Sequence, residues 1–207
     1  MFQSNCEIYS QDRLFHDGFV KPDVALINVS PPDKHGNCSL GVEVATSLAA
    51  VRHSKLIVAQ VNKSMPRTIG QGQISYSQFD YVLHVDEDMP QFIVKDISDV
   101  EKKISKYIAE LIPDGATLQM GIGNIPNAVL SSLGNHRNLG VHTEMFSDGL
   151  IPLLENGVVN NLEKTFLNSK TVTSFIMGSQ KLYDYVDDNS NVIFLDSGVV
   201  NNPAIIV

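Results

Sequence analysis

Short apolar runs and helical patterns alternate along the chain, and this alternation predicts its architecture. Apolar runs of four to eight residues bounded by Pro, Gly or polar residues are typical of buried strands. We expect strands at 23–30, 55–61, 81–85, 116–120, 140–146, 171–177 and 191–195. Strands that alternate with helices form α/β folds with mostly parallel sheets and flanking helices.

Helical patterns fill the segments between these strands. We expect helices at 42–53, 97–111, from 126 onward, at 150–154 and near 181–186. The clearest is an amphipathic helix with apolar residues three or four positions apart at Ile97, Val100, Ile104, Ile108 and Leu111. The polar run 86–90 interrupts the pattern before this helix, so we expect two parts that meet near 87–96, one at 1–90 and one at 91–207.

Composition and charge exclude several classes of protein. The chain has 207 residues of which 43% are hydrophobic, enough for a buried core. Its net charge of −8 argues against nucleic-acid binding. Two cysteines, Cys6 and Cys38, make no disulfide framework, and no His, Cys and acid cluster predicts a metal site. Without a signal-peptide pattern or a membrane-length apolar run, we expect a cytoplasmic protein with no membrane partner.

A glycine turn between a strand and a helix is the first candidate site. The segment Leu118–Leu130 reads as strand, Gly121-Ile122-Gly123-Asn124-Ile125 turn, and a helix whose first turn holds Pro126. Glycines let a ligand approach the backbone, and the free N–H groups of the following helix favour an anion. A dinucleotide fingerprint would need Gly or Ala where Pro126 stands, and a tight turn without any ligand is a third interpretation.

Glu144 is the second candidate, because it falls late in the expected strand 140–146. If this strand runs parallel to the strand before the glycine turn, Glu144 and the turn share one carboxyl edge, where open α/β sheets bind ligands. A glutamate is ionised at neutral pH and can be a nucleophile without a separate base. A solvated or capping role for Glu144 is the alternative, and spacing does not decide between them. His142 shares its face of the strand, but one histidine makes no triad.

The two candidate segments together carry a family resemblance. Gly121-Ile122-Gly123-Asn124-Ile125-Pro126-Asn127-Ala128-Val129, followed by His142-Thr143-Glu144-Met145-Phe146-Ser147-Asp148-Gly149, resembles the acetyl-CoA hydrolase/transferase family, and in particular its 4-hydroxybutyrate and butyrate-type CoA-transferases. Further matching stretches are 29–36, 39–41, 60–62, 65–68, 178–179, 182–189 and 200–203.

The resemblance implies a class I CoA-transferase that uses a glutamyl-CoA thioester. It places the catalytic glutamate at Glu144 and the CoA-contacting turn at Gly121, Ile122, Gly123, Asn124 and Ile125. Coenzyme A would be a substrate, with no tightly bound cofactor and no metal, and the other substrate a small carboxylic acid of the 4-hydroxybutyrate, butyrate or acetate type. Loops after two expected strands make His35 and Arg67 candidates for substrate binding at the acyl pocket, with Arg67 holding a substrate carboxylate and a structural role as the alternative.

Members of this family are about twice as long and have two α/β domains. We therefore expect part of the N-terminal domain in 1–90 and the N-terminal part of the second domain, with the glutamate, in 91–207. A glycine-rich segment that completes the site would lie beyond Val207. The expected protein partner is a second copy or the remaining part of the same enzyme. Acyl-CoA hydrolysis and non-catalytic CoA binding remain alternatives to CoA transfer.

Overall fold

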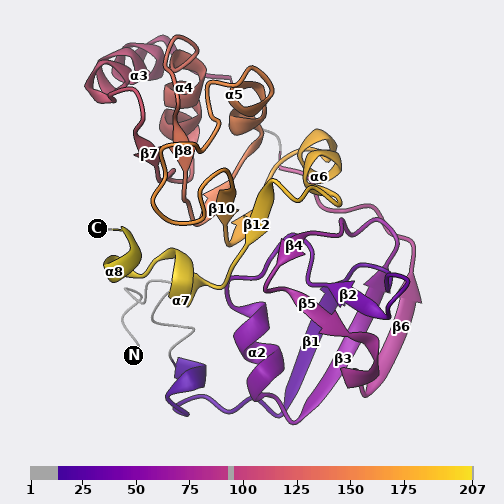
Figure 1. The fold of residues 1–207 in the computed structure, drawn as a ribbon. Helices are drawn as coiled ribbons and strands as arrows, with labels where there is room; N and C mark the ends of the chain where they lie inside the picture. Colours follow the sequence, from indigo (N-terminus) through magenta and orange to yellow (C-terminus); the bar gives the residue numbers. More distant parts are fainter. Residues whose placement is uncertain (1–13, 93–95, 207) are drawn as a thin grey trace.

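The computed structural model describes residues 14–92 and 96–206 (Figure 1). Three parallel strands form its first sheet. The strand order is β1-β3-β6, with β1 at Val24–Val29, β3 at Leu56–Asn62 and β6 at Tyr81–Val85. These three positions were predicted by the apolar runs. We call this the N-terminal sheet.

A second group of parallel strands gathers segments from both halves of the chain. One sheet has the order β10-β12-β4, and a parallel bridge between His142 and Val172 joins it to the pair β7-β8. The bounds are β4 Ile69–Gly70, β7 Thr117–Leu118, β8 Gly140–Val141, β10 Thr171–Thr173 and β12 Val192–Phe194. We call these five strands the site sheet. The fold is α/β with mostly parallel sheets, as predicted.

The remaining elements cover these strands or connect them. The helices are α2 Ser47–His53, α3 Asp99–Leu111, α4 Asn124–Ser132, α5 Ile151–Glu155, α6 Gln180–Val186, α7 Ser197–Val200 and α8 Pro203–Ile206, with 3₁₀ turns η1 Tyr76–Gln78 and η2 Asp148–Leu150. The parallel pair β9 Met145–Phe146 and β11 Phe175–Ile176 continues β8 and β10, and β2 Asn37–Ser39 pairs with β5 Gln73–Ser75 as the antiparallel exception.

The first helix begins later than its sequence pattern predicts. The expected helix started at Val42, but α2 starts at Ser47. The N–H of Val44 donates to Ser174 O at 3.0 Å, and Val42 O accepts from the N–H of Ile176 at 2.9 Å. These residues therefore run beside β11 as an extended segment, because the strand offers their backbone groups partners that a helix start would leave free.

Helix α3 is present as predicted, but Val100, Ile104 and Leu111 of its predicted apolar stripe are exposed, whereas Ile108 packs against the core. Ser98 caps it in a reciprocal capping box with Glu101, whose backbone N–H donates to Ser98 Oγ. The residues that α3 buries are Ser105 and Ala109. Small side chains let α3 lie close to α4, and Ser105 Oγ is 3.0 Å from Ser132 Oγ.

Strand β4 joins the first half of the chain to the site sheet. Its residues Ile69 and Gly70 pair with Ile193 and Phe194 of β12 (Figure 1). Gly70 has φ +137°, a conformation that side chains disfavour, and a Cβ there would collide with the backbone of Phe194. Only glycine therefore fits at position 70, where β4 pairs with β12.

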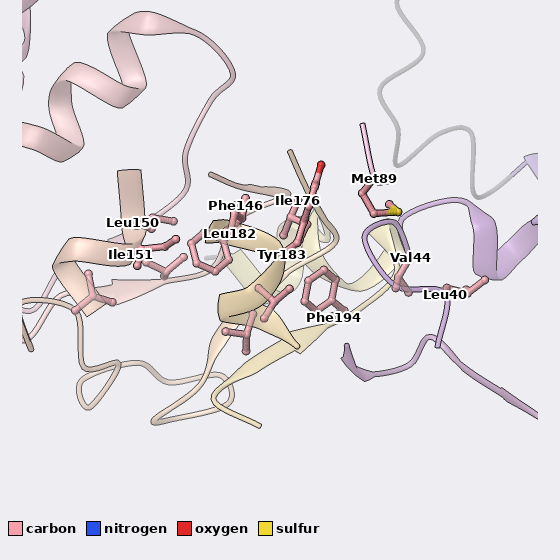
Figure 2. Packing of buried hydrophobic residues seen from close by; sticks show 14 of the residues in the cluster. Leu40, Val44, Met89, Phe146, Leu150, Ile151, Ile176, Leu182, Tyr183 and Phe194 are labelled. Atoms are coloured by element: carbon pink, nitrogen blue, oxygen red, sulfur yellow. The ribbon is translucent and has the colours of Figure 1, made fainter. Parts of the chain in front are cut away.

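One hydrophobic core runs across both groups of strands. Figure 2 shows Leu40, Val44 and Met89 from the first half of the chain in the same cluster as Phe146 and Phe194 from the second half. The Tyr183 hydroxyl also donates to Pro90 O at 2.5 Å. Contacts of this kind hold the segment after β6 against α6.

Candidate active site

Glu144 lies at a break in the strand that the sequence predicted to run unbroken from 140 to 146. β8 ends at Val141, β9 begins at Met145, and Glu144 occupies a bend between them. The neighbouring strand breaks at the same level, at Ser174 between β10 and β11. Its residues fix the Glu144 carbonyl oxygen, which accepts from the N–H groups of Ser174 and Phe175, both at 3.0 Å. Thr173 Oγ1 also donates to it, at 3.1 Å.

The Glu144 carboxylate is half-buried and has one side-chain partner among the described residues. Asn201 Nδ2, directly after α7, donates to Glu144 Oε2 at 3.0 Å. The other end of this amide, Asn201 Oδ1, is buried and has no hydrogen-bond partner within the described ranges. Sequence reasoning assigned Asn201 no role in the site, although it lies in the 200–203 stretch that carried the family resemblance.

The glycine turn begins beside Glu144. Thr143 Oγ1 accepts from the N–H of Met120 at 2.9 Å and lies 3.2 Å from Met120 O and 3.1 Å from Met145 O. Since Thr143 and Met120 directly precede Glu144 and Gly121, the structure brings the two predicted segments together. β7 and β8 are parallel neighbours, so both segments leave the sheet at its carboxyl edge.

Gly123 shapes the end of this turn. Its φ of +126° and ψ of −174° fall in a region populated almost only by glycine, and it is the N-cap of α4. Space is open around it, since no atom lies within 4 Å of the position where a Cβ would sit. Ile122 in the turn and Ile125 in the first turn of α4 are exposed, so this segment presents backbone and apolar side chains outward.

A buried histidine lies two residues before Glu144. His142 Nε2 donates to Val200 O at 2.7 Å, so this ring nitrogen carries the proton. Burial is the largest cause that lowers the pKa of His142, and nearby Lys164 lowers it further. The imidazole is therefore neutral at pH 7. Val200 and Asn201 are consecutive, so one short segment holds both His142 and Glu144.

Lys164 is a buried ammonium without a carboxylate within 4 Å among the described residues. Its Nζ donates to Val141 O at 2.7 Å and to Lys170 O at 2.6 Å. Burial lowers its pKa to about 8. Together with His142 and Phe166 it borders a cavity of about 260 Å³, whose other lining residues are Thr117, Gln119, Thr165, Ile205 and Ile206. Glu144 does not line this cavity.

The two predicted substrate-binding residues, Arg67 and His35, lie in one loop cluster. Arg67 pairs with Asp33 and with Asp188, each at 2.9 Å, and so ties the loop after β1 to the end of α6. His35 is exposed, and its N–H donates to Asp33 Oδ1 at 2.8 Å. Within the described residues, the hydrogen bonds and ion pairs of Arg67 and His35 do not reach Glu144 or the glycine turn.

The described residues contain neither a metal-binding cluster nor a membrane-spanning helix. No three His, Cys, Asp or Glu side chains within 14–92 and 96–206 are grouped so that they could hold a metal ion. No helix in these ranges combines the length and the apolar character that crossing a membrane requires.

Comparison with known proteins gives consistent matches over the chain. Residues 7–95 match the model of the acetyl-CoA hydrolase/transferase N-terminal domain. A 4-hydroxybutyrate coenzyme A transferase of Clostridium kluyveri is 46% identical over 98% of this chain and 47% of its own length. A succinyl-CoA:acetate/propanoyl-CoA:succinate CoA transferase of Fasciola hepatica is 47% identical over 93% of this chain and 41% of its own length. An acetyl-CoA hydrolase of Kluyveromyces lactis matches a shorter stretch, 43% of this chain.

Solved structures agree with the sequence matches. The crystal structure of 4-hydroxybutyrate CoA-transferase from Porphyromonas gingivalis superimposes with a TM-score of 0.94 at 40% identity, covering 98% of this chain and 52% of that one. By its fold and these matches, the chain is an α/β protein similar over nearly all of its length to CoA-transferases. Within this class the chain belongs to the acetyl-CoA hydrolase/transferase family. It spans about half the length of the relatives it matches.

Proposed function

We propose that this chain carries the nucleophilic part of a CoA-transferase site, with Glu144 as the nucleophile. The observation that supports this most directly is the Glu144–Asn201 hydrogen bond of 3.0 Å at a strand break beside the glycine turn. A carboxylate held by a neutral amide at the ligand edge of a parallel sheet is oriented without being neutralised by a cation. A glutamate that only faces solvent would not require a neighbouring amide to orient its carboxylate.

The proposed reaction proceeds in four steps. A Glu144 carboxylate oxygen attacks the thioester carbonyl carbon of an acyl-CoA, and the C–S bond breaks to give an acyl-glutamyl anhydride and CoA thiolate. The thiolate attacks the glutamyl carbonyl carbon and releases the first carboxylate, leaving a Glu144–CoA thioester. An acceptor carboxylate attacks this thioester to form a new anhydride and thiolate. The thiolate then attacks the acceptor's acyl carbon, which yields the new acyl-CoA and free Glu144.

The glycine turn would approach the thiol end of coenzyme A. Gly121, Ile122, Gly123, Asn124 and Ile125 leave the sheet beside Glu144, and Ile122 is 64% exposed, which suits contact with an apolar pantetheine chain. Each tetrahedral intermediate needs hydrogen-bond donors, and one such donor typically contributes about 3–4 kcal/mol. Free N–H groups in the first turn of α4 are candidates for this role.

The substrate of the whole protein is proposed at the level of its class, an acyl-CoA and a small carboxylate of the 4-hydroxybutyrate, butyrate or acetate type. Binding of a substrate carboxylate by Arg67, and of the substrate by His35, remains a prediction. Two aspartates already pair with the Arg67 guanidinium, so such binding would require one of these pairs to open.

Hydrolysis of acyl-CoA is the second candidate function. A relative named acetyl-CoA hydrolase matches part of the chain. Transfer and hydrolysis use the same carboxylate, and they differ in whether water or a carboxylate intercepts the activated glutamyl group. Non-catalytic CoA binding is a third possibility, because the chain spans about half of its relatives' length.

Intact-mass measurement of the chain with acyl-CoAs tests the proposal. We expect a covalent product heavier by the mass of CoA less one water, borohydride reduction of the thioester, and peptide mapping to Glu144. Glu144→Gln should remove the product, and in turnover assays it should lower kcat by roughly 10⁴-fold or more, since the nucleophile is lost. Glu155→Gln, which changes an exposed residue at the end of α5, is the matched control and should react normally.

The other outcomes separate the alternatives. Modification of another acid, or normal labelling of Glu144→Gln, would overturn the assignment of Glu144. Free acid released without transfer to an added carboxylate would favour hydrolysis. CoA binding without any covalent product would favour the non-catalytic function.

A further inference from the structure

The ammonium group of Lys164 is a buried positive charge that no described carboxylate balances. The side chain is 5% exposed, and its Nζ donates to the carbonyl oxygens of Val141 and Lys170. An ammonium has three N–H donors, so one donor has no acceptor among the described residues. The pKa of about 8 lies above neutral pH, so most molecules carry this charge at pH 7. Because an unbalanced buried charge is costly, its presence indicates that an anion binds beside it.

The cavity that Lys164 borders has the lining that a small amphipathic anion requires. None of the described residues that line it is Asp or Glu. The hydroxyl groups of Thr117 and Thr165 add polar groups, while Phe166 and Ile205 contribute apolar surface. At about 30 Å³ for each water, its volume of about 260 Å³ has room for roughly eight waters, and so for a short-chain acid.

This cavity lies at the carboxyl edge of the site sheet. Two of its lining residues, Gln119 and His142, directly follow the last residues of β7 and β8. Gly121 of the glycine turn and Glu144 each come two residues later in these same segments. Open α/β sheets bind ligands at this edge, so a molecule in the cavity would lie next to the candidate active site.

The backbone of β8 fixes the place of the lysine. A Cβ on Gly140 would lie 2.5 Å from Lys164 Cγ and 3.0 Å from Thr117 Oγ1, so both side chains lie over the same face of this glycine. The lysine stem therefore crosses β8 at its first residue, and the ammonium reaches the carbonyl oxygen of the last residue, Val141. Contacts of this kind hold the cation beside the cavity before any ligand arrives.

From this buried cation and the amphipathic cavity beside it, we propose that the cavity binds a short-chain monocarboxylate. The carboxylate accepts from Lys164 Nζ, and the apolar chain lies against Phe166. Within the described residues, the contacts of Arg67 and His35 do not extend to this edge, so Lys164 supplies the cation there. The binding itself is independent of the proposed reaction, but the identification of the ligand as an acid that the reaction consumes rests on the proposed function.

NMR titration of the 207-residue chain with butyrate, in the absence of coenzyme A, tests the site. We expect saturable binding with a dissociation constant of about 1 mM, typical of so small a ligand. Lys164→Met keeps an apolar stem but removes the charge, and it should weaken binding by about tenfold or more. Butyramide has the same shape without the charge, and inorganic phosphate has charge without an apolar chain. Each should bind more weakly than butyrate by about tenfold or more.

Two matched variants separate this site from general charge effects and from the nucleophile. Lys170→Met makes the same change in the same loop, but Lys170 Nζ donates to Ser190 O and does not line the cavity, so butyrate affinity should be unchanged. Glu144→Gln should also bind butyrate normally, so failure of the proposed reaction would leave this result intact. Circular dichroism verifies that each variant is folded.

Several results would overturn the proposed carboxylate site. One is the absence of saturable butyrate binding, and another is unchanged affinity in folded Lys164→Met. Equal weakening by Lys170→Met would show that net charge alone attracts the acid. Butyramide or phosphate bound as tightly as butyrate would show that the cavity does not select an anion with an apolar chain, and this comparison needs no variant.

Discussion

The N-terminal sheet and the site sheet differ in how their faces are covered. The strands β1 and β3 have six and seven residues, whereas those of the site sheet have two or three. Yet Leu26 on β1 is 79% exposed and Leu83 on β6 is 58% exposed, while the three residues of β10 are all buried. The longer strands therefore form the less covered sheet.

This contrast shows what positions a reactive side chain. Parallel sheets normally have helices on both faces, and the N-terminal sheet leaves apolar side chains of β1 and β6 open on one of them. Most residues of the site sheet are instead buried, so its short strands can break and turn without exposing their backbone. Glu144 and Ser174 occupy such breaks. Burial around the strands, and not their length, supplies the rigid support of the site.

The largest predicted difference between the two sheets is in stability. Phe194→Ala in β12 removes a fully buried ring and should lower the free energy of unfolding by about 3–5 kcal/mol. Leu26→Ala on the open face should lower it by less than about 0.5 kcal/mol, because that side chain is mostly in water. Urea denaturation with linear extrapolation measures both. A loss at Leu26 as large as that at Phe194 would show that this face is covered in solution.

The sequence pattern predicted the positions of individual strands and turns, which depend mainly on neighbouring residues. The strand Tyr81–Val85 was predicted to the residue, and the glycine turn lies between a strand and a helix as expected. The pairing of Glu144 with the glycine turn followed from a general property of parallel strands, whose carboxyl ends share an edge.

The features that the sequence did not predict depend on long-range contacts. The strand break at Glu144 is held by Thr173, Ser174 and Phe175, about thirty residues away. Asn201 reaches Glu144 across 57 residues. The orientation of α3 is set by Ser105 and Ala109, whose small size matters only because α4 lies against them.

The second prediction contrasts the buried cation of Lys164, which donates to β8 of the site sheet, with an exposed charge beside the N-terminal sheet. Burial lowers the pKa of Lys164 from 10.5 to about 8, so between these values the unfolded chain binds the proton that the folded chain has lost. Stability therefore rises with pH across this window. Relative to Lys164→Met, the free energy of unfolding of the original protein should rise by on the order of 3 kcal/mol from pH 8 to 10.5.

An exposed lysine provides the control for this pH dependence. Lys55, directly before β3 of the N-terminal sheet, pairs with Asp23, and both side chains are 78% exposed. Lys55→Met should show no comparable change relative to the original protein over the same range. Urea unfolding at a series of pH values makes the comparison, and a flat difference between the original protein and Lys164→Met would contradict the buried-ammonium interpretation.

The smallest predicted effect separates two glycines of the turn beside Glu144. Gly123→Ala keeps open space around the new methyl group but forces a φ of +126° on a residue with a side chain, which should cost about 1–3 kcal/mol. Gly121→Ala has no such φ, and its Cβ would meet Pro126 Cγ at an ordinary 3.5 Å, so stability should change by less than about 0.5 kcal/mol. Because Gly121→Ala leaves the fold intact, it is the sharper probe of ligand approach. If coenzyme A lies against this turn, the Gly121 variant should bind it more weakly in calorimetry while unfolding normally. Unchanged affinity in that variant would place the ligand elsewhere along the edge of the site sheet.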